Sequence, residues 1–562
     1  MKTKKYYLFL LFTFTNLTIF SQTANWQFLK NAGGTKSEYC NDMCSDKNGN
    51  TIIVGESTSP TMSFGATTFT NPASSYPTSA IIAKYDSAGN IIWAKNYPGM
   101  NAYVAVNSVA VDSSNNILVI GSFGGNSLII ENTTLVNNTA QPDVFVAKFD
   151  PSGNLFWAKN YGGWSYDFGT SVAVDINNDI LITGYFYADT LKMDNITLLN
   201  PNMGCFGDVF VAKLNSSTGN TIWANRAGGY GKDIPNCIKT DRFGNVYIAG
   251  ETQVSTPMNF GSFNLTNASF SGMFIAKYDN NGQILWAKKA GGSFKDAFKD
   301  LTIDDVSGNI YAVGKHVGAS PFDNIILPSV GYMENAFVAK YDSTGNVIWA
   351  KAILSAQDGF AMKVCHSSNG NIFVSGTTQD LSLMYDSITT VNTPNGLFLL
   401  NIDSQGNMLS SNNSITSGNV RQSALVSIDS QDNLFISGNY ISKYLSLSPY
   451  SISNHDTNPS SNTFDIYFAK GSVNPLTTSV KQKEFNPTDI ILYPNPTNKY
   501  FSISNIKSHV IISIIDVNGN FIMEKKINAN SEINIENIIP GMYSIKIEDG
   551  ASILYKKLII AR

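Results

Sequence analysis

A carboxylic acid recurs in this chain four residues after the second glycine of a Gly-Gly pair. The acids are Glu38, Asp167, Asp233 and Asp296, and Asp358 takes the equivalent place in a further repeat. If these acids circle the mouth of a channel, they could hold a hard cation such as calcium or accept hydrogen bonds from sugar hydroxyls. The alternative is that each acid caps the amides of its own loop. The sequence predicts a ligand-binding role for the five acids and leaves the capping role open beside it.

No other motif predicts a reaction. The histidines His316, His366, His455 and His509 follow no metal-ligand pattern, and no Gly-x-Ser-x-Gly nucleophile motif occurs. The recurrent Asp-x-x-Gly-Asn segments lack the alternating oxygen ligands and the terminal Glu of a calcium loop, so they predict hairpin turns. We therefore expect no metal and no cofactor, with calcium at the acids kept open. A catalytic triad assembled from distant segments also stays open, because triads are defined by geometry.

The elements that must position these residues follow from a repeat of tryptophans. The repeated tryptophans lie 63 to 67 residues apart, at Trp26, Trp93, Trp157, Trp223, Trp286 and Trp349. A fixed period longer than one hairpin is typical of stacked supersecondary units such as propellers or solenoids.

Each repeat contains three apolar phrases that predict strands. The first begins Asp-x-x-Gly-Asn, the second ends near Lys-Tyr-Asp, and the third contains the tryptophan. Their period-2 alternation is typical of strands. The turn that opens the first phrase needs a residue that tolerates positive φ, and suitable residues occur at Gly49, Asn115, Asn178, Gly244, Gly308, Gly370 and Asp432. A variable stretch between the first two phrases predicts an extra hairpin.

The number and offset of the phrases predict a closed ring. The first two phrases occur seven times each, and Trp26 precedes the first copy, whereas no tryptophan strand follows Lys470. The segment Trp26–Leu29 therefore supplies the missing outer strand of the last blade, which removes exposed sheet edges. We predict an all-β chain with a seven-bladed β-propeller over 22–471. These phrases resemble the bacterial SBBP β-propeller repeat family, which is functionally mixed, so the resemblance implies architecture and not activity.

The C-terminal segment has a different pattern. A polar linker over 472–488 precedes short alternating strands that predict a small β-sandwich over 489–562. It contains Pro494-Asn495-Pro496, then Asp-x-x-Gly, then Gly541 and Tyr543 in a Pro-Gly-x-Tyr segment, and finally a strand with Lys556 and Lys557. This order resembles the type A C-terminal sorting domain of the type IX secretion system. The resemblance implies that the secretion machinery is a partner and that the terminal strand is the part it recognises.

Export is also indicated at the other end. Residues 1–21 combine a basic start, a short apolar stretch and a small residue before Gln22, which predicts a signal peptide and not a membrane anchor. We therefore expect an extracellular or outer-membrane surface location, with no transmembrane segment in the mature chain. Only 14% of residues are charged and the net charge is −4, so no nucleic-acid partner is expected. The five cysteines fit no zinc pattern, and most of them are interpreted as small buried hydrophobic residues.

Two functions remain after these exclusions. The first is a secreted, non-enzymatic propeller that binds a glycan or a surface protein through variable loops on a rigid ring. The alternative is an extracellular polysaccharide hydrolase or lyase with its site at the channel mouth. A purely structural surface component is a third hypothesis.

Overall fold

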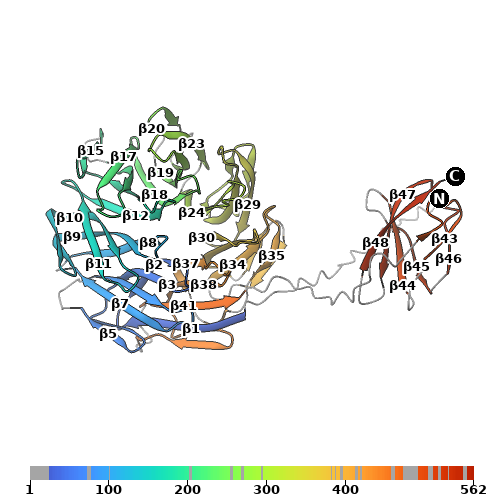
Figure 1. The fold of residues 1–562 in the computed structure, drawn as a ribbon, viewed down its shortest axis with the longest axis horizontal. Helices are drawn as coiled ribbons and strands as arrows, with labels where there is room; N and C mark the ends of the chain where they lie inside the picture. The colour runs from blue at the N-terminus through green and yellow to red at the C-terminus, as the bar shows by residue number, and fades with distance from the viewer. Residues whose placement is uncertain are drawn as a thin grey trace, which may run out of the picture. The chain divides into compact units, whose positions relative to one another are not determined.

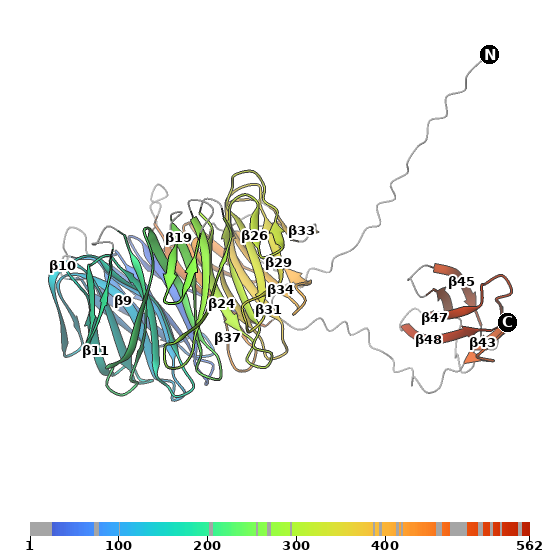
Figure 2. The same ribbon diagram turned by 90° about the horizontal axis from the view of Figure 1, so that it is seen from above.

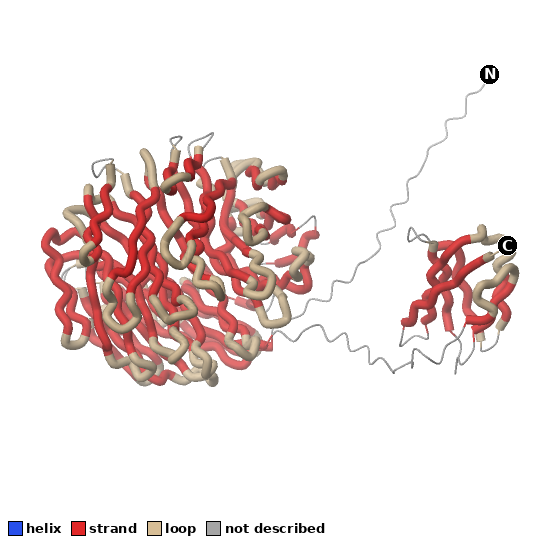
Figure 3. The backbone as a smooth tube through the Cα atoms, turned by 45° about the horizontal axis from the view of Figure 1, so that its top comes forward, coloured by secondary structure: helices blue, strands red, loops and turns tan. Residues whose placement is uncertain are grey.

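The computed structural model describes residues 25–562 apart from 72–77, 100–101, 202–205, 254–256, 267–270, 293–294, 381, 386–387, 393–395, 412–414, 418–419, 457–462, 473–491, 504–509, 517–520, 529–530, 549–552 and 562. The signal peptide predicted for 1–21, most of the predicted linker and Cys205 lie outside these residues. The chain divides into two compact units, Met1–Val473 and Asn474–Arg562. Every regular element in the described part is a strand (Figure 3), so the all-β prediction is confirmed.

The first unit is built from antiparallel sheets of four strands arranged around an axis (Figures 1 and 2). The innermost strands are β2 (Glu38–Ser45), β8 (Val104–Val111), β12 (Asp167–Val174), β18 (Lys232–Thr240), β24 (Ala297–Ile303), β30 (Gly359–His366) and β37 (Val420–Ile428). Each packs against the next, and β37 packs against β2. The innermost strands therefore form a closed ring, which is the arrangement of a β-propeller.

From the axis outward, the first phrase forms the second strand of each sheet, the second phrase forms the third strand, and the tryptophan phrase forms the outermost strand. The second strands are β3 (Thr51–Ser57), β9 (Ile117–Ile130), β13 (Ile180–Phe186), β19 (Val246–Gln253), β25 (Ile310–His316), β31 (Ile372–Thr378) and β38 (Leu434–Tyr440). The third strands are β6 (Ser79–Tyr85), β10 (Thr133–Phe149), β16 (Asp208–Leu214), β22 (Ser271–Tyr278), β28 (Asn335–Tyr341), β34 (Leu397–Ile402) and β41 (Asp465–Ser472). The outermost strands are β7 (Ile91–Pro98), β11 (Leu155–Tyr161), β17 (Thr221–Ala227), β23 (Ile284–Ala290), β29 (Val347–Leu354), β35 (Met408–Ser411) and β1 (Asn25–Gly34).

The two ends of this unit meet in one sheet, as predicted. Strand β1 pairs antiparallel with β41, with Trp26 opposite Gly471 and Asn31 opposite Tyr467. The rings of Phe28 and Phe468 lie 5.2 Å apart between centroids. The predicted pairing of the N-terminal segment with the last sheet is confirmed.

The predicted extra hairpins are present, and they cross between sheets. They are β4 (Thr61–Phe64) with β5 (Thr67–Thr70), β14 (Thr190–Met193) with β15 (Ile196–Leu199), β20 (Met258–Phe260) with β21 (Phe263–Leu265), β26 (Ser320–Phe322) with β27 (Ile325–Leu327), β32 (Ser382–Tyr385) with β33 (Ile388–Asn392), and β39 (Tyr444–Leu447) with β40 (Tyr450–Ser453). Strand β4 pairs with β1, β32 pairs with β29, and β39 pairs with β36 (Ile415–Ser417), so these hairpins cover edges formed by the preceding repeat. In the second repeat, β9 and β10 instead run on as one long pair.

The recurrent tryptophans join each sheet to the next. The indole N–H of Trp223 donates to the backbone oxygen of Asn280 at 3.1 Å. A Cβ atom on Gly282 would lie 2.7 Å from this indole, and Gly282 has a φ of +81°, so glycine is required at the turn. Equivalent indole bonds to the following turn are made by Trp93, Trp157, Trp286 and Trp349.

The repeated aspartates and lysines of the first two phrases form buried ion pairs. Lys84 Nζ lies 3.0 Å from the Asp46 carboxylate, and both side chains are almost fully buried. The same ammonium donates to the backbone oxygen of Pro151 in the next turn. The residues predicted to need positive φ all have it. The Asp-x-x-Gly-Asn segments are therefore hairpin turns whose aspartates bond to their own turn and, at Asp46, Asp112, Asp175 and Asp241, also to a lysine.

The second unit contains two sheets around one apolar core. Its strands are β42 (Leu492–Tyr493), β43 (Tyr500–Ile503), β44 (Val510–Ile515), β45 (Phe521–Ile527), β46 (Glu532–Asn534), β47 (Gly541–Glu548) and β48 (Ile553–Ile560). One sheet has the order β42-β43-β46 and the other the order β45-β44-β47-β48.

Candidate ligand-binding site in the propeller

The predicted acids lie at, or just before, the starts of innermost strands, and most are buried. Glu38, Asp167, Asp233 and Asp296 are at most 1% exposed, whereas Asp358 is half-buried. The first four accept a hydrogen bond from the second glycine of the Gly-Gly pair, at 2.6 to 3.0 Å. Asp358 instead accepts from the Glu334 amide at 3.0 Å.

The Gly-Gly pair is required by packing on both of its residues. A Cβ atom on Gly162 would lie 2.1 Å from the Asp143 carboxylate, and one on Gly163 would lie 2.3 Å from the backbone oxygen of Thr190. Asp143 belongs to the preceding sheet and Asp167 to the next, so two carboxyl groups meet at the seam between sheets. Burial, with a contribution from Asp143, raises the pKa of Asp167 well above its usual value.

The same pattern recurs at two other seams. Burial raises the pKa of Glu38 to about 8, and nearby Asp465 adds to this rise. Burial likewise raises the pKa of Asp233 to about 7, with Asp208 as the neighbouring acid. This geometry favours the capping role that the sequence left open. A ligand-binding role of the five acids remains a prediction.

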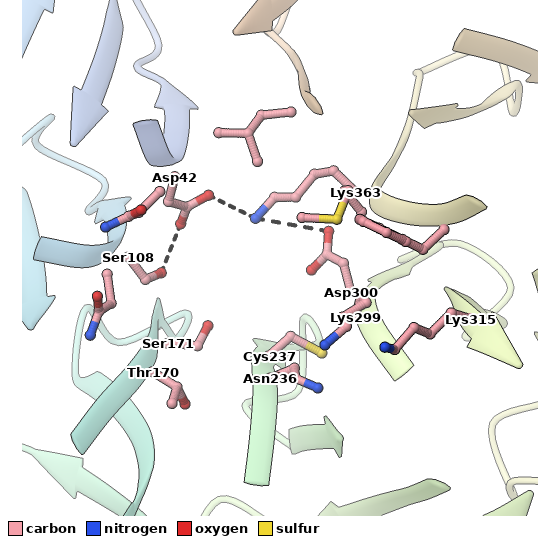
Figure 4. Close-up of a pocket in the computed structure, with 15 residues that line it drawn as sticks. Asp42, Ser108, Thr170, Ser171, Asn236, Cys237, Lys299, Asp300, Lys315 and Lys363 are labelled. Carbon is pink, nitrogen blue, oxygen red and sulfur yellow. Dashed lines mark hydrogen bonds and ion pairs between the residues drawn. The ribbon is translucent and has the colours of Figure 1, made fainter. Parts of the chain in front are cut away.

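The innermost strands enclose a separate cavity of about 380 Å³, shown in Figure 4. Several of these strands carry a β-bulge whose extra residue lines the cavity. The Asn41 amide donates to the Val106 backbone oxygen at 3.0 Å, and the Asn107 amide donates to that of Gly169 at 2.7 Å. The bulged residues therefore tie each sheet to its neighbour around the cavity wall.

A charged network crosses the cavity. Lys363 Nζ lies 2.7 Å from Asp42 and 3.9 Å from Asp300, and the Ser108 hydroxyl donates to Asp42 at 2.8 Å (Figure 4). Burial alone would raise the pKa of Asp42, but the charges of Lys363 and Lys239 outweigh it and hold this pKa below its usual value.

The cysteines near the cavity are thiols. The four described cysteines are free, and Cys40 and Cys237 are buried. Burial raises the pKa of Cys237 to about 12, so it stays protonated at neutral pH. This environment agrees with the interpretation of these cysteines as small apolar residues.

An aromatic patch lies at the loop end of β12 and β13. We define the aromatic patch as Tyr166, Phe168, Tyr185 and Tyr187. Tyr166 stacks on Phe168 with centroids 6.3 Å apart, and Phe168 stacks on Tyr185 at 5.1 Å. Tyr187 contacts both other tyrosine rings edge-on. Tyr166 is 47% exposed, and Trp164 in the same loop is 56% exposed.

Charged side chains occupy the positions equivalent to Tyr185 in three other repeats. Each of these positions directly follows the glycine that ends the first phrase, and their occupants are Glu56, Glu251 and Lys315. Lys315 lines the cavity, so the equivalent residues lie at the same height around the ring. Lys232 Nζ also lies 5.4 Å from the centre of the Tyr185 ring. The equivalent positions around the ring therefore carry aromatic faces on the third repeat and charges of both signs on three others.

Sequence reasoning did not identify the aromatic patch. Its residues come from a loop and from two strands, and each lies at a position that differs between repeats. The position of Tyr185, directly after the glycine that ends the first phrase, could have indicated it. This position varies between repeats, whereas the positions around it are repeated.

The predicted sorting residues lie together in the second unit. The Asn495 amide donates to the Lys557 backbone oxygen at 2.7 Å, and its side-chain oxygen accepts from the Ile559 amide at 2.9 Å. Gly541 and Tyr543 lie on β47, which pairs with β48, where Lys556 and Lys557 are found. The Pro494–Pro496 segment is thus attached to the terminal strand.

Neither a membrane span nor a metal cluster is found in the described part of the chain. None of its elements is a helix suited to crossing a membrane. Among the same residues, no three His, Cys, Asp or Glu side chains gather as a metal site would require. Calcium binding by the five acids stays a prediction.

Two family models match parts of the chain. Residues 491–561 match the secretion system C-terminal sorting domain, and residues 222–255 match the SBBP β-propeller repeat. Both resemblances noted in the sequence are thereby confirmed. The sorting domain indicates export to the cell surface or the extracellular space.

Individual relatives are distant. An uncharacterized WD repeat-containing protein of Acanthamoeba polyphaga mimivirus is 25% identical over 361 residues, which cover 52% of this chain and 26% of that protein. The Neurospora crassa Pan2 WD40 domain has a TM-score of 0.38 at 10% identity, with 79% of this chain and 90% of that chain covered. The polysaccharide lyase Uly1 has a TM-score of 0.36 at 9% identity, with 80% and 100% covered.

Proposed function

We propose that the exported protein is a seven-bladed propeller that binds a glycan at the loop end of its cavity, without catalysing a reaction, and that its C-terminal sandwich serves the type IX secretion machinery. The aromatic patch is the observation that carries this proposal. Tyrosine and phenylalanine faces pack against the C–H faces of sugars, and tyrosine hydroxyls can bond to sugar hydroxyls. A rigid ring that presents such side chains on its loops is a common design for binding.

A polar group at the position equivalent to Tyr185 in the first repeat supports recognition of hydroxyl-rich ligands. One carboxylate oxygen of Glu56 is buried without a hydrogen-bond partner in the described structure. Burial raises the pKa of Glu56 to about 7. An unsatisfied buried oxygen gains free energy when a ligand hydroxyl donates to it. Aromatic faces with a few such polar groups are typical of small-ligand pockets.

Retention on a panel of immobilised polysaccharides tests this proposal. We expect Tyr166→Ala and Tyr185→Ala to weaken retention of the bound polysaccharide roughly tenfold, because each removes one stacking face. Tyr444→Ala is the matched control, since Tyr444 is 50% exposed but lies on the β39–β40 hairpin outside the patch.

The outcomes separate the alternatives. Retention without product release supports a binding protein. Release of reducing ends that is lost on substitution of Asp167, Asp233 or Asp296 would identify the hydrolase or lyase. Binding only to a surface protein, with no retention on any polysaccharide, would refute the glycan proposal.

A further inference from the structure

The cavity enclosed by the innermost strands has both lysines and aspartates in its lining. Its charged lining residues are Lys299, Lys315 and Lys363 against Asp42 and Asp300. The lysines Lys299 and Lys315 come from β24 and β25, two sheets along the ring from the patch, and Figure 4 shows them on the same side of the cavity. Glu334 pairs with Lys315 and Lys239 pairs with Asp300, so an anion would bind where a lysine lacks such a partner.

Lys299 is the cavity lysine without a close acidic partner. Lys315 lies 2.9 Å from Glu334, and Lys363 lies 2.7 Å from Asp42. Among the described residues, no carboxylate oxygen lies within 4.0 Å of the Lys299 ammonium. Glu251 and Glu334 act on it only from farther away, and burial lowers the pKa of Lys299. A partly buried ammonium without a counterion is costly, and a bound anion would remove that cost.

The position of Lys299 in its strand explains why it faces the cavity. The pairing of β24 with β25 shifts between Phe298 and Asp300, so Lys299 is the bulged residue. In the first repeats the equivalent residues Asn41 and Asn107 reach across to the next sheet. At Lys299 this amide is replaced by a cation, which changes the wall from a neutral to a charged one.

We propose that the glycan is acidic, and that a carboxylate or sulfate group of one sugar binds the Lys299 ammonium while neighbouring sugars stack on the aromatic patch. This inference rests on the proposed function. The cavity volume of about 380 Å³ falls in the range typical of small-ligand pockets, so a sugar unit fits while a folded protein surface does not.

Calorimetry with three matched polymers tests the inference on the mature protein. The ligands are polygalacturonate, its carboxyl-reduced neutral form and a sulfated galactan. We expect at least one acidic polymer to bind about tenfold or more tightly than the neutral one, with an affinity that falls as salt rises. Lys299→Met should remove this preference, whereas Lys299→Arg should keep it. Lys192→Met, on the exposed outer hairpin strand β14, is the control for a loss of one positive charge.

Each outcome decides one claim. The two acidic polymers distinguish a carboxylate from a sulfate as the bound group. Equal affinity for the acidic and neutral polymers, unchanged in Lys299→Met, would overturn the inference but leave glycan binding intact. Failure of all three polymers and of the wider panel to bind would remove both proposals. Thermal melting of every variant separates loss of binding from loss of fold.

Discussion

At the scale of single residues, a repeated acid need not be a repeated ligand site. Asp167 and Asp233 each accept a hydrogen bond from a loop amide at a seam, and other groups occupy the space that Cβ atoms on the adjoining glycines would take. Spacing alone shows that a side chain is required. It does not show whether the carboxylate faces a ligand or its own backbone, since that depends on how neighbouring sheets pack.

The buried acids predict stability that decreases as pH rises. The pKa of Asp233 is about 7 in the folded protein against an ordinary value of 3.8, so the folded protein keeps a proton that the unfolded chain releases. Its stabilising contribution is complete below about pH 4 and is lost as pH rises toward 7. We expect Asp233→Asn to reduce the fall in unfolding free energy between pH 5 and pH 8 by on the order of 1–3 kcal/mol.

Urea unfolding at both pH values measures this difference. Asp86→Asn, which removes an acid in a hairpin turn, is the control and should leave the fall in place. An unchanged pH dependence in Asp233→Asn would show that this carboxyl is ionised in the folded protein.

At the scale of elements, the local sequence pattern predicts most strands. It does not predict which strands from different repeats pair with each other. Period-2 alternation and the turn residues predicted the strands of the repeat and its extra hairpin. The pairing of β4 with β1 and of β32 with β29 could not be predicted, because it joins segments of different repeats and depends on how adjacent sheets lie. The outer edge of a sheet is thereby covered, which protects it from pairing with other chains.

The tryptophan strands predict a clear hierarchy of stability effects. Trp223→Ala should lower the free energy of unfolding by about 3–5 kcal/mol, because it removes packing against Gly282 and the indole hydrogen bond. Trp223→Phe keeps most of the packing and should cost about 1–2 kcal/mol. Chemical denaturation of the two variants measures both values, and equal stability of Trp223→Ala and the wild type would contradict this role of the indole.

At the scale of the whole molecule, the offset of the repeat was the decisive sequence signal. A tryptophan strand before the first phrase and none after the last one favoured pairing of the ends over an open solenoid, and β1 pairs with β41. The candidate site was much less predictable. The aromatic patch is built where repeats differ, and the cavity charges become neighbours only when strands from distant repeats form the ring.

Removal of the closing strand should therefore destabilise the ring more than an equal loss elsewhere. Deletion of 22–34 leaves β41 without its outer partner, so we expect a markedly lower melting temperature and faster amide hydrogen exchange in β41. Deletion of thirteen residues within 474–488 is the matched control and should leave both unchanged. Equal effects of the two deletions would show that β1 adds little to the ring.

Because Asn25 pairs with Ser472, the ring can close only when the chain extends to the end of β41. The opening strand is the earliest part of the propeller to be synthesised, yet its partner is the last. A chain truncated anywhere before β41 lacks the strand with which the segment from Trp26 to Leu29 pairs. Such fragments leave the edge of β1 that faces β41 unpaired, and an unpaired edge is prone to pair with other chains.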